Sequence, residues 1–291
     1  MKIVITGADG QLGQTLTHCL ADCDVTPLSR SALDITSDDL NSQLQAHRPD
    51  WVVNTAAYTA VDKAESEASL ADHANHIAVG MLAAACKELG SRLLHLSTDF
   101  VFSGSGNIPY AVDAECDPEN IYGKTKHQGE QAALAAHPAG VCIVRTAWLY
   151  SASGNNFVRT MLRLMQERDS LGIVMDQIGS PTSTSTLATC IRELIKQSET
   201  GIFHWTDAGT ASWYDFAVAI YEEAQAAGIL SRPVSITPIR SEQFPTPAAR
   251  PHYSVLDISK TYSHTGLQPI HWRVPLRTVI GKIAEMENNI V

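Results

Sequence analysis

The feature that most constrains the fold is a glycine-rich turn near the beginning of the chain. The apolar run Lys2–Thr6 predicts a buried strand, and an amphipathic pattern predicts a helix over residues 11–21. A strand, a glycine turn and a helix in this order favour a βα unit whose turn approaches a phosphate group. We therefore expect a dinucleotide pyrophosphate to bind at this turn, through Gly7, Gly10, Gln11, Leu12 and Gly13.

The first half of the chain continues to alternate short apolar strands with helical patterns. The expected strands are residues 2–6, 25–28, 51–54, 92–97 and 141–145, and the expected helices are residues 11–21, 69–89 and 119–136. This alternation is typical of parallel strands joined by right-handed crossovers. We predict an α/β fold with a Rossmann-like, doubly wound parallel sheet.

After about residue 150 the pattern changes to helices separated by proline-rich loops. The expected helices are residues 155–168, 183–196, 212–227 and 275–286. We predict that residues 1–150 form the dinucleotide-binding Rossmann domain. Residues 151–291 are expected to form mainly a smaller C-terminal substrate domain, interleaved with returning Rossmann elements.

Charge and composition exclude several kinds of partner. The formal net charge of the 291 residues is -10, which opposes nonspecific binding of nucleic acid. The longest small and apolar run, residues 77–86, is too short to cross a membrane. The six cysteines are scattered without a CxxC pair, and no signal peptide is evident, so we expect a cytoplasmic protein.

The end of the second predicted strand bears on the choice of cofactor. An acidic residue at this place binds the ribose 2′-hydroxyl of NAD, whereas an arginine accommodates the 2′-phosphate of NADP. Here the strand ends Leu28-Ser29-Arg30, with no carboxylate. This predicts NADPH, with NADH as the alternative. Asp34 and Ile35 are candidate adenine contacts, although Asp34 could equally cap a turn.

Tyr122 and Lys126 lie four residues apart in a predicted helix and therefore share one face of it. A nearby ammonium favours tyrosinate, so we expect the pKa of Tyr122 to fall below its ordinary value near 10. Such a tyrosine can donate a proton to a carbonyl oxygen as hydride arrives. Thr98, at the end of the fourth strand, is placed to hydrogen-bond that carbonyl. The predicted catalytic residues are Tyr122, Lys126 and Thr98.

Together these residues look like the extended short-chain dehydrogenase/reductase superfamily. Over nearly its whole length the chain resembles the family of dTDP-4-dehydrorhamnose reductases. The segments that carry this closer resemblance are residues 54–65, 97–102, 122–126, 145–150, 154–157, 176–182 and 245–251.

The resemblance implies NADPH-dependent reduction of the C4 ketone of dTDP-4-dehydro-L-rhamnose, the last step toward a cell-surface sugar donor. It implies that Tyr122 is the proton donor and that Lys126 holds the nicotinamide ribose. Ala56, Ala57 and Tyr58 would line the cofactor. Arg250 is our own candidate for the substrate diphosphate, because a dianionic ligand needs a cation on an acidic protein. The expected substrate contacts are Thr98, Asp99, Trp148, Asn156 and Arg250.

Three positions depart from the family pattern. Phe100 stands where members commonly have tyrosine, so a hydroxyl is missing there. Thr15 and Ser185 stand where some members carry glutamates associated with metal-linked dimers, and neither is a good ligand for a hard cation. We therefore expect no metal and a monomer.

Two other functions stay open as alternatives. One is a different nucleotide-sugar 4-ketoreductase or dehydratase of the same superfamily. A dehydratase, however, has an Asp-Glu pair after the threonine, and here Asp99 is followed by Phe100, which cannot transfer protons. The other is a non-catalytic, NADP-binding regulatory subunit, as in methionine adenosyltransferase. The segments 145–150 and 154–157 favour the enzyme. The nucleotide, dTDP or UDP, and the C4 epimer formed are not decided by the sequence.

Overall fold

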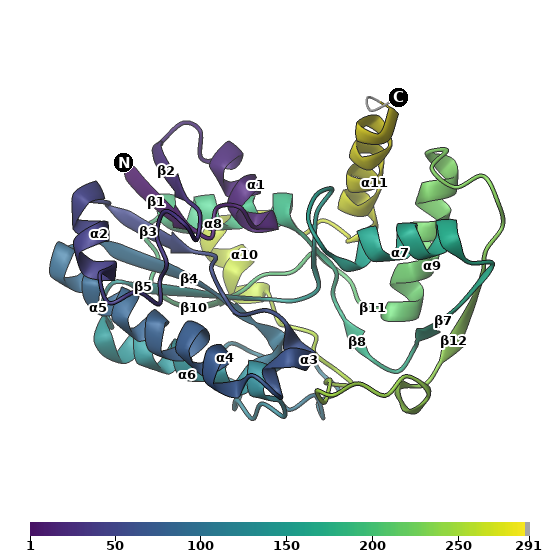
Figure 1. Ribbon diagram of the computed structural model, residues 1–291, viewed down its shortest axis with the longest axis horizontal. Coiled ribbons are helices and arrows are strands. Elements are labelled where there is room, and N and C mark those ends of the chain that lie inside the picture. Colours follow the sequence, from purple (N-terminus) through teal and green to yellow (C-terminus); the bar gives the residue numbers. More distant parts are fainter. Residues whose placement is uncertain (289–291) are drawn as a thin grey trace.

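A six-stranded parallel sheet forms the centre of the larger lobe of the protein (Figure 1). The computed structural model describes residues 1–288. The strand order is β10-β5-β4-β3-β1-β2, and every neighbouring pair is parallel. The strands are β1 (Lys2–Thr6), β2 (Asp24–Leu28), β3 (Trp51–Asn54), β4 (Arg92–Thr98), β5 (Val141–Thr146) and β10 (Gly201–His204). The predicted Rossmann-like sheet is thereby confirmed.

Helices cover both faces of this sheet, which is why its strands are apolar on both sides. In β1, Ile3 and Ile5 face one core, whereas Val4 faces the other. The first core lies under α1 (Gln11–Cys19), α8 (Thr184–Lys196) and α10 (Ser259–Thr265). The second lies under α2 (Leu40–His47), α5 (Ala78–Leu89) and α6 (Ile121–Ala136).

Besides α10, two segments from beyond residue 150 return to the larger lobe. Helix α8 packs against α1, and β10 extends the sheet by pairing with β5. The sequence indicated the helix of α8, but the four residues of β10 are too few to show a clear strand pattern.

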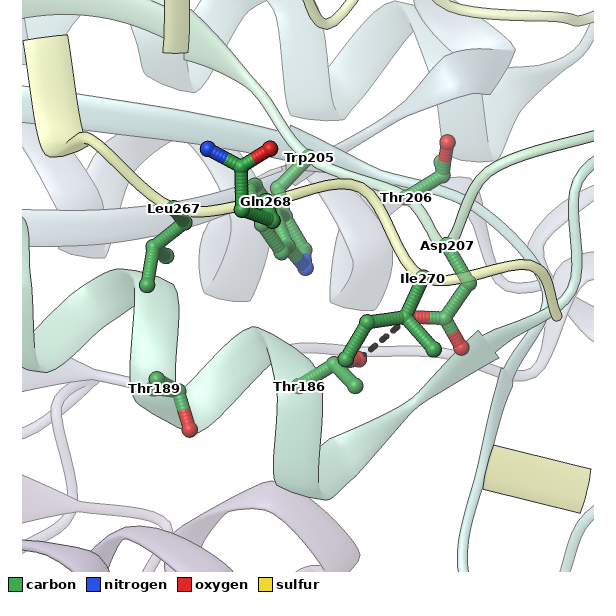
Figure 2. Close-up of a pocket in the computed structure, with 8 residues that line it drawn as sticks. All are labelled: Thr186, Thr189, Trp205, Thr206, Asp207, Leu267, Gln268 and Ile270. Carbon is green, nitrogen blue, oxygen red and sulfur yellow. Dashed lines mark hydrogen bonds between the residues drawn. The ribbon is translucent and has the colours of Figure 1, made fainter. Parts of the chain in front are cut away.

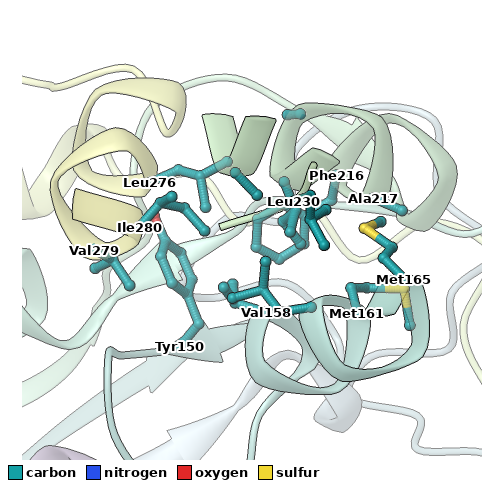
Figure 3. Close-up of a cluster of buried hydrophobic side chains, with 14 of the residues drawn as sticks. Tyr150, Val158, Met161, Met165, Phe216, Ala217, Leu230, Leu276, Val279 and Ile280 are labelled. Carbon is teal, nitrogen blue, oxygen red and sulfur yellow. The ribbon is translucent and has the colours of Figure 1, made fainter. Parts of the chain in front are cut away.

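The smaller lobe contains α7 (Phe157–Glu167), α9 (Trp213–Ala226) and α11 (Arg273–Asn288), beside the parallel pair β7 (Ser170–Val174) and β12 (Ser235–Ile239). Helix α7 buries Val158, Met161, Leu162 and Met165, the spacing of one helix face. Figure 3 shows this face directed toward Phe216 and the C-terminal helix. This apolar core is separate from the two cores of the sheet.

Short elements connect the two lobes and complete the fold. Strand β6 (Leu149–Tyr150) pairs in parallel with β9 (Thr182–Ser183). Strand β8 (Ile178–Gly179) pairs antiparallel with β11 (Ala211–Ser212). The remaining short helices are α3 (Val61–Ala64), α4 (Ala68–Asp72), η1 (His73–Ile77), η2 (Asp99–Val101) and η3 (Ser241–Gln243). Within residues 1–288, none of the helices combines the length and apolar character needed to cross a bilayer.

Candidate active site

The glycine turn after β1 packs tightly against neighbouring backbone. Gly7 adopts a φ of +67°, and a Cβ on it would lie 2.8 Å from the backbone nitrogen of Ala56. A Cβ on Gly13 would lie 2.5 Å from the carbonyl oxygen of Gly7. Side chains at these two positions would push the helix and the neighbouring loop away from the turn, so only glycine permits this packing.

The glycine turn leads directly into the N-terminus of α1, where we expect the cofactor to bind. Gly10 is the N-cap of α1, and no acidic side chain lies in the first turn. The first N–H groups of a helix have no intrahelical acceptor, and the helix dipole favours an anion there. The backbone of Gln11 and Leu12 therefore suits an anionic group, and its binding of a dinucleotide pyrophosphate stays a prediction. The Leu12 side chain packs in the core.

The loop after β3 is fixed next to this turn. Its residues Ala56, Ala57 and Tyr58 are half-buried. Asn75 anchors the loop, because its side chain accepts from the Tyr58 N–H at 2.8 Å and donates to the Tyr58 carbonyl at 3.0 Å. Asn75 lies in η1, a single π-helical segment within the helix that the sequence predicted over 69–89. Such segments interrupt the regular helix pattern and give little signal in a sequence.

The residues after β2 are arranged as an exposed ion pair. The Arg30 side chain is 84% exposed and contacts Asp34 at 3.1 Å. Asp34 also accepts from the backbone N–H and hydroxyl of Thr36, and these hydrogen bonds are the main cause of its lowered pKa. Asp34 thus caps a turn, which was the alternative to an adenine contact. Ile35 is buried in the core of the sheet.

Tyr122 and Thr98 are brought together at the carboxyl end of β4. Tyr122 lies in the first turn of α6, and its side chain lies beside that of Thr98. Thr98 also donates to Asp99 at 3.0 Å, and Phe100 packs edge-on against the Tyr122 ring. A Cβ on Gly123 would lie 2.2 Å from the Phe100 carbonyl, so glycine is required for this approach of α6 to β4.

The electrostatics of this pair differ from the sequence prediction. Burial raises the pKa of Tyr122 to about 12, and the Asp99 carboxylate acts in the same direction. The prediction that Lys126 lowers this pKa is wrong for the structure described here. Lys126 is buried and directs its side-chain Nζ into the sheet, where it donates to the Leu96 carbonyl and lies 3.1 Å from His95 Nε2. Burial lowers the pKa of Lys126 to about 8.

Asp99 is buried beside Thr98 and Tyr122. Burial raises the pKa of its carboxyl group to about 6, while hydrogen bonds from neighbouring groups oppose that rise. The following residue, Phe100, carries no titratable group. An Asp-Glu pair of the dehydratase type is therefore not formed after Thr98.

Trp148 is held in a strained backbone conformation near the end of β5. It has a φ of +47°, which is uncommon for a bulky residue. Its ring stacks on that of Trp213 with the centroids 3.5 Å apart and the planes 7° from parallel. A Cβ on Gly179 would lie 2.6 Å from the Trp148 ring. Packing from the smaller lobe thus determines where this predicted substrate contact lies.

Asn156 and Arg250 use their polar groups within the protein. Asn156 caps α7 and donates to Gln11 Oε1 at 2.8 Å. Arg250 forms a two-pronged ion pair with Asp62, with N–O distances of 3.0 and 2.8 Å. Asp62 lies on α3, shortly after the loop that contains Tyr58. Arg250 therefore joins residues 246–251 to the predicted cofactor loop, and its charge is already matched by a carboxylate.

A buried ionic cluster beneath the site was not predicted from the sequence. Arg145 donates to both carboxylate oxygens of Glu130, at 2.9 and 2.7 Å, and to Cys116 Sγ at 3.3 Å. Cys116, His127 and Glu130 lie close enough together to share a metal ion. The Arg145 guanidinium already supplies a positive charge to Glu130 and Cys116, which disfavours a second cation. The absence of a metal stays a prediction.

Thr15 and Ser185, the positions discussed for metal-linked dimers, lie on α1 and α8. Thr15 hydrogen-bonds Thr184 at 3.0 Å, and Ser185 contacts Ser183 at 2.8 Å. Both hydroxyls are thus used within the chain.

Comparison with known proteins identifies the family. Residues 1–285 match the model of the RmlD substrate binding domain. The chain belongs to the RmlD family. A dTDP-4-dehydrorhamnose reductase from Aggregatibacter actinomycetemcomitans is 41% identical over 288 residues, which cover 96% of this chain and 98% of that protein. The resemblance stated from the sequence is confirmed.

Solved structures of RmlD relatives agree over the whole fold. A dTDP-4-dehydrorhamnose reductase from Clostridium acetobutylicum is 41% identical, with a TM-score of 0.91 over 97% of this chain and 99% of that one. The enzyme of the same name from Bacillus anthracis, solved in complex with NADP, is 38% identical, with a TM-score of 0.90 and the same coverage.

The RmlD-family chain also contains a small cavity of about 70 Å³ outside the site described above (Figure 2). Trp205 and Leu267 lie on the side opposite helix α8, and Asp207 and Thr186 are hydrogen-bonded at one end. None of its lining residues is among the predicted catalytic or cofactor-binding residues.

Proposed function

We propose that this chain reduces the C4 ketone of dTDP-4-dehydro-L-rhamnose with NADPH, giving dTDP-L-rhamnose. The observation that carries the proposal is the meeting of Tyr122 and Thr98 at the carboxyl end of β4, in a fold that also presents a phosphate-binding turn. We infer the substrate from full-length relatives named dTDP-4-dehydrorhamnose reductase. We infer the cofactor from a reductase of that name solved in complex with NADP.

The cofactor would bind along the carboxyl ends of β1, β2 and β3. Gly7, Gly10 and Gly13, with the backbone of Gln11 and Leu12, would hold the pyrophosphate. The exposed Arg30 would meet the 2′-phosphate, and Ala56, Ala57 and Tyr58 would line the nicotinamide half. When bound, NADPH supplies the hydride, and the side chains of this chain supply position and the proton.

The proton would come from Tyr122. A phenol whose pKa is about 12 is fully protonated at neutral pH, so the resting residue carries the proton that the developing alkoxide needs. Thr98, which lies beside Tyr122, would hold the ketone oxygen in line with the phenol. Lys126 would hold the nicotinamide ribose, and Asp99 and Trp148 would contact the sugar. Asn156, on the substrate side, would contact the pyrophosphate turn through Gln11, and Arg250 would contact the substrate diphosphate.

We further propose that the enzyme acts as a cytoplasmic monomer. The hydroxyls of Thr15 and Ser185, at the positions where glutamates accompany metal-linked dimers, form hydrogen bonds inside the chain. The scattered cysteines are all free, which suits a reducing compartment. Light scattering at several protein concentrations tests the oligomeric state.

The decisive experiment is product analysis. Purified protein is incubated with NADPH and dTDP-4-dehydro-L-rhamnose, and the sugar product is identified by NMR. We expect dTDP-L-rhamnose and a matching loss of NADPH. Tyr122→Phe keeps the ring and removes the proton donor, so it should lower kcat by about 10²-fold or more while NADPH still binds. NADPH binding without any turnover of the wild-type chain would favour the non-catalytic subunit instead.

A further inference from the structure

A row of buried polar side chains crosses the sheet beneath the proposed active site. Thr6, Asn54 and His95 occupy register positions beside one another on β1, β3 and β4. Two residues earlier, the same strands carry Val4, Val52 and Leu93, which pack into the apolar core. The three polar side chains are fully buried and lie on the face covered by α6. A polar row at this depth is costly unless its members are hydrogen-bonded.

The hydrogen bonds of this row fix the orientation of Asn54. Its Oδ1 accepts from the Ala56 N–H at 3.2 Å and from the Thr6 hydroxyl at 2.7 Å. A backbone N–H can only donate, so the opposite orientation of the amide would set two donors against each other. Asn54 must therefore present its Nδ2 amine to His95, whose Nδ1 lies 3.0 Å away.

The orientation of Asn54 in turn fixes the tautomer of His95. Because Nδ1 accepts a hydrogen bond, the single proton of the neutral ring must be on Nε2. Burial is the main cause that lowers the pKa of His95 well below its ordinary value, so the ring is neutral at physiological pH. The Nε2–H points at Lys126 Nζ, 3.1 Å away.

An ammonium cannot accept this hydrogen bond, but a neutral amine can. A neutral Lys126 would accept from His95 and donate to the Leu96 carbonyl, which satisfies both contacts. We propose that the Thr6–Asn54–His95 row positions Lys126 and shifts its protonation equilibrium toward the neutral amine in the ligand-free protein. His95 is then a positioning residue that acts through Lys126.

Other groups around Lys126 do not remove this preference. Glu130, one turn further along α6, is the group that raises the pKa of Lys126, but burial outweighs it. The Glu130 carboxylate is itself ion-paired with the Arg145 guanidinium. Asn54 of this row also accepts from the N–H of Ala56, which lies in the loop proposed to line the cofactor. A shift of that loop would change the acceptor of the Ala56 N–H and so reach Lys126 through Asn54 and His95.

The first test is made on the unmodified, ligand-free protein. Long-range proton–nitrogen NMR correlations report which ring nitrogen of a histidine carries the proton, and a His95→Gln variant assigns the His95 signals. We expect a protonated Nε2 and an unprotonated Nδ1. A protonated Nδ1 would overturn the proposal. This measurement is made without ligand and does not depend on turnover. Its outcome is therefore independent of whether the chain is a reductase and of whether Lys126 binds the nicotinamide ribose.

The second test reverses the direction of the hydrogen bonds from Asn54 through His95 to Lys126. Asn54→Asp offers His95 an acceptor in place of a donor, so the proton should move to Nδ1 and Nε2 should accept from the Lys126 ammonium. The Lys126 titration midpoint, followed by NMR of labelled lysine, should rise by about one pH unit or more. Because the new carboxylate also attracts the ammonium directly, the same change is made in a His95→Phe background. An equal rise in both backgrounds would show a charge effect alone and would overturn the role of His95.

Discussion

Asn156 Nδ2 donates to Gln11 Oε1 at 2.8 Å, which ties the cap of α7 to the first residue of α1. Ser151 also donates to the same oxygen, and Gly154 lies so close that a Cβ on it would be 2.8 Å from Gln11 Cγ. The smaller lobe thus contacts the larger lobe at the helix terminus that is proposed to hold the pyrophosphate. The position of Gln11 depends on residues that lie about 140 positions away in the sequence.

This contact predicts that Asn156 supports cofactor binding as well as stability. Asn156→Ala removes both the helix cap and the hydrogen bond to Gln11, and should lower the free energy of unfolding by about 1–2 kcal/mol. Asn156→Ser keeps a capping oxygen but is too short to reach Gln11. Both variants should bind NADPH more weakly, measured by titration, while chemical denaturation should show the larger loss for alanine. Wild-type NADPH affinity in the serine variant would show that the hydrogen bond from Asn156 to Gln11 does not support cofactor binding.

Arg30 should determine the preference for NADPH. Its side chain is 84% exposed and held only by Asp34, so a 2′-phosphate can replace that partner. Arg30→Ala should lower kcat/KM for NADPH about 10-fold or more and leave kcat/KM for NADH nearly unchanged. Asp34→Ala, which removes the competing carboxylate, is the matched control and should not weaken NADPH binding. A wild-type ratio of the two kcat/KM values in the Arg30 variant would contradict the assignment.

The sequence predicted the features of the site that depend on local pattern. The glycine turn, the helix that carries Tyr122 and Lys126, and Thr98 at a strand end follow from spacing and periodicity, and the structure places Tyr122 and Thr98 together. The direction of the Lys126 side chain could not be predicted in this way. It depends on His95, a residue 31 positions earlier that is adjacent only after β4 and α6 have packed.

The ion pairs of the site were equally hidden from the sequence. Arg250 contacts Asp62 across 188 positions, and Arg145 finds Glu130 only after β5 has entered the sheet beside α6. A sequence shows which residues are charged, but tertiary packing decides which carboxylate each arginine contacts. The short strands β7, β10 and β12 were missed for a related reason, since they are stabilised by pairing with neighbours distant in the chain.

The pair formed by Arg250 and Asp62 gives a prediction about substrate affinity. If Arg250 contacts the diphosphate, Arg250→Ala should raise the KM for dTDP-4-dehydro-L-rhamnose about 10-fold or more. Asp62→Asn keeps the shape of the partner and frees the charge of Arg250, so it should not raise that KM. If both changes raise KM alike, the pair acts by holding residues 246–251 in place rather than by binding the substrate. An unchanged KM in Arg250→Ala would exclude both roles.

Asp207 predicts how stability depends on pH. It is buried at one end of the small cavity, where it accepts hydrogen bonds from the Ser183 N–H and the Thr186 hydroxyl. Burial raises the pKa of this carboxyl group from 3.8 to about 7. Since the folded protein holds the proton more tightly than the unfolded chain, the favourable contribution is fully present below pH 4. It is lost as the pH rises through 7.

Asp207→Asn keeps the size of the side chain and an acceptor for Ser183, but it does not titrate. The free energy of unfolding of this variant, relative to wild type, should therefore rise between about pH 4 and pH 7 and then level off. The expected change is on the order of a few kcal/mol. Urea denaturation at several pH values measures it, and Asp22→Asn, at an exposed aspartate, controls for the loss of one charge. A difference that stays flat across this range would show that the Asp207 carboxyl group is not destabilised by burial.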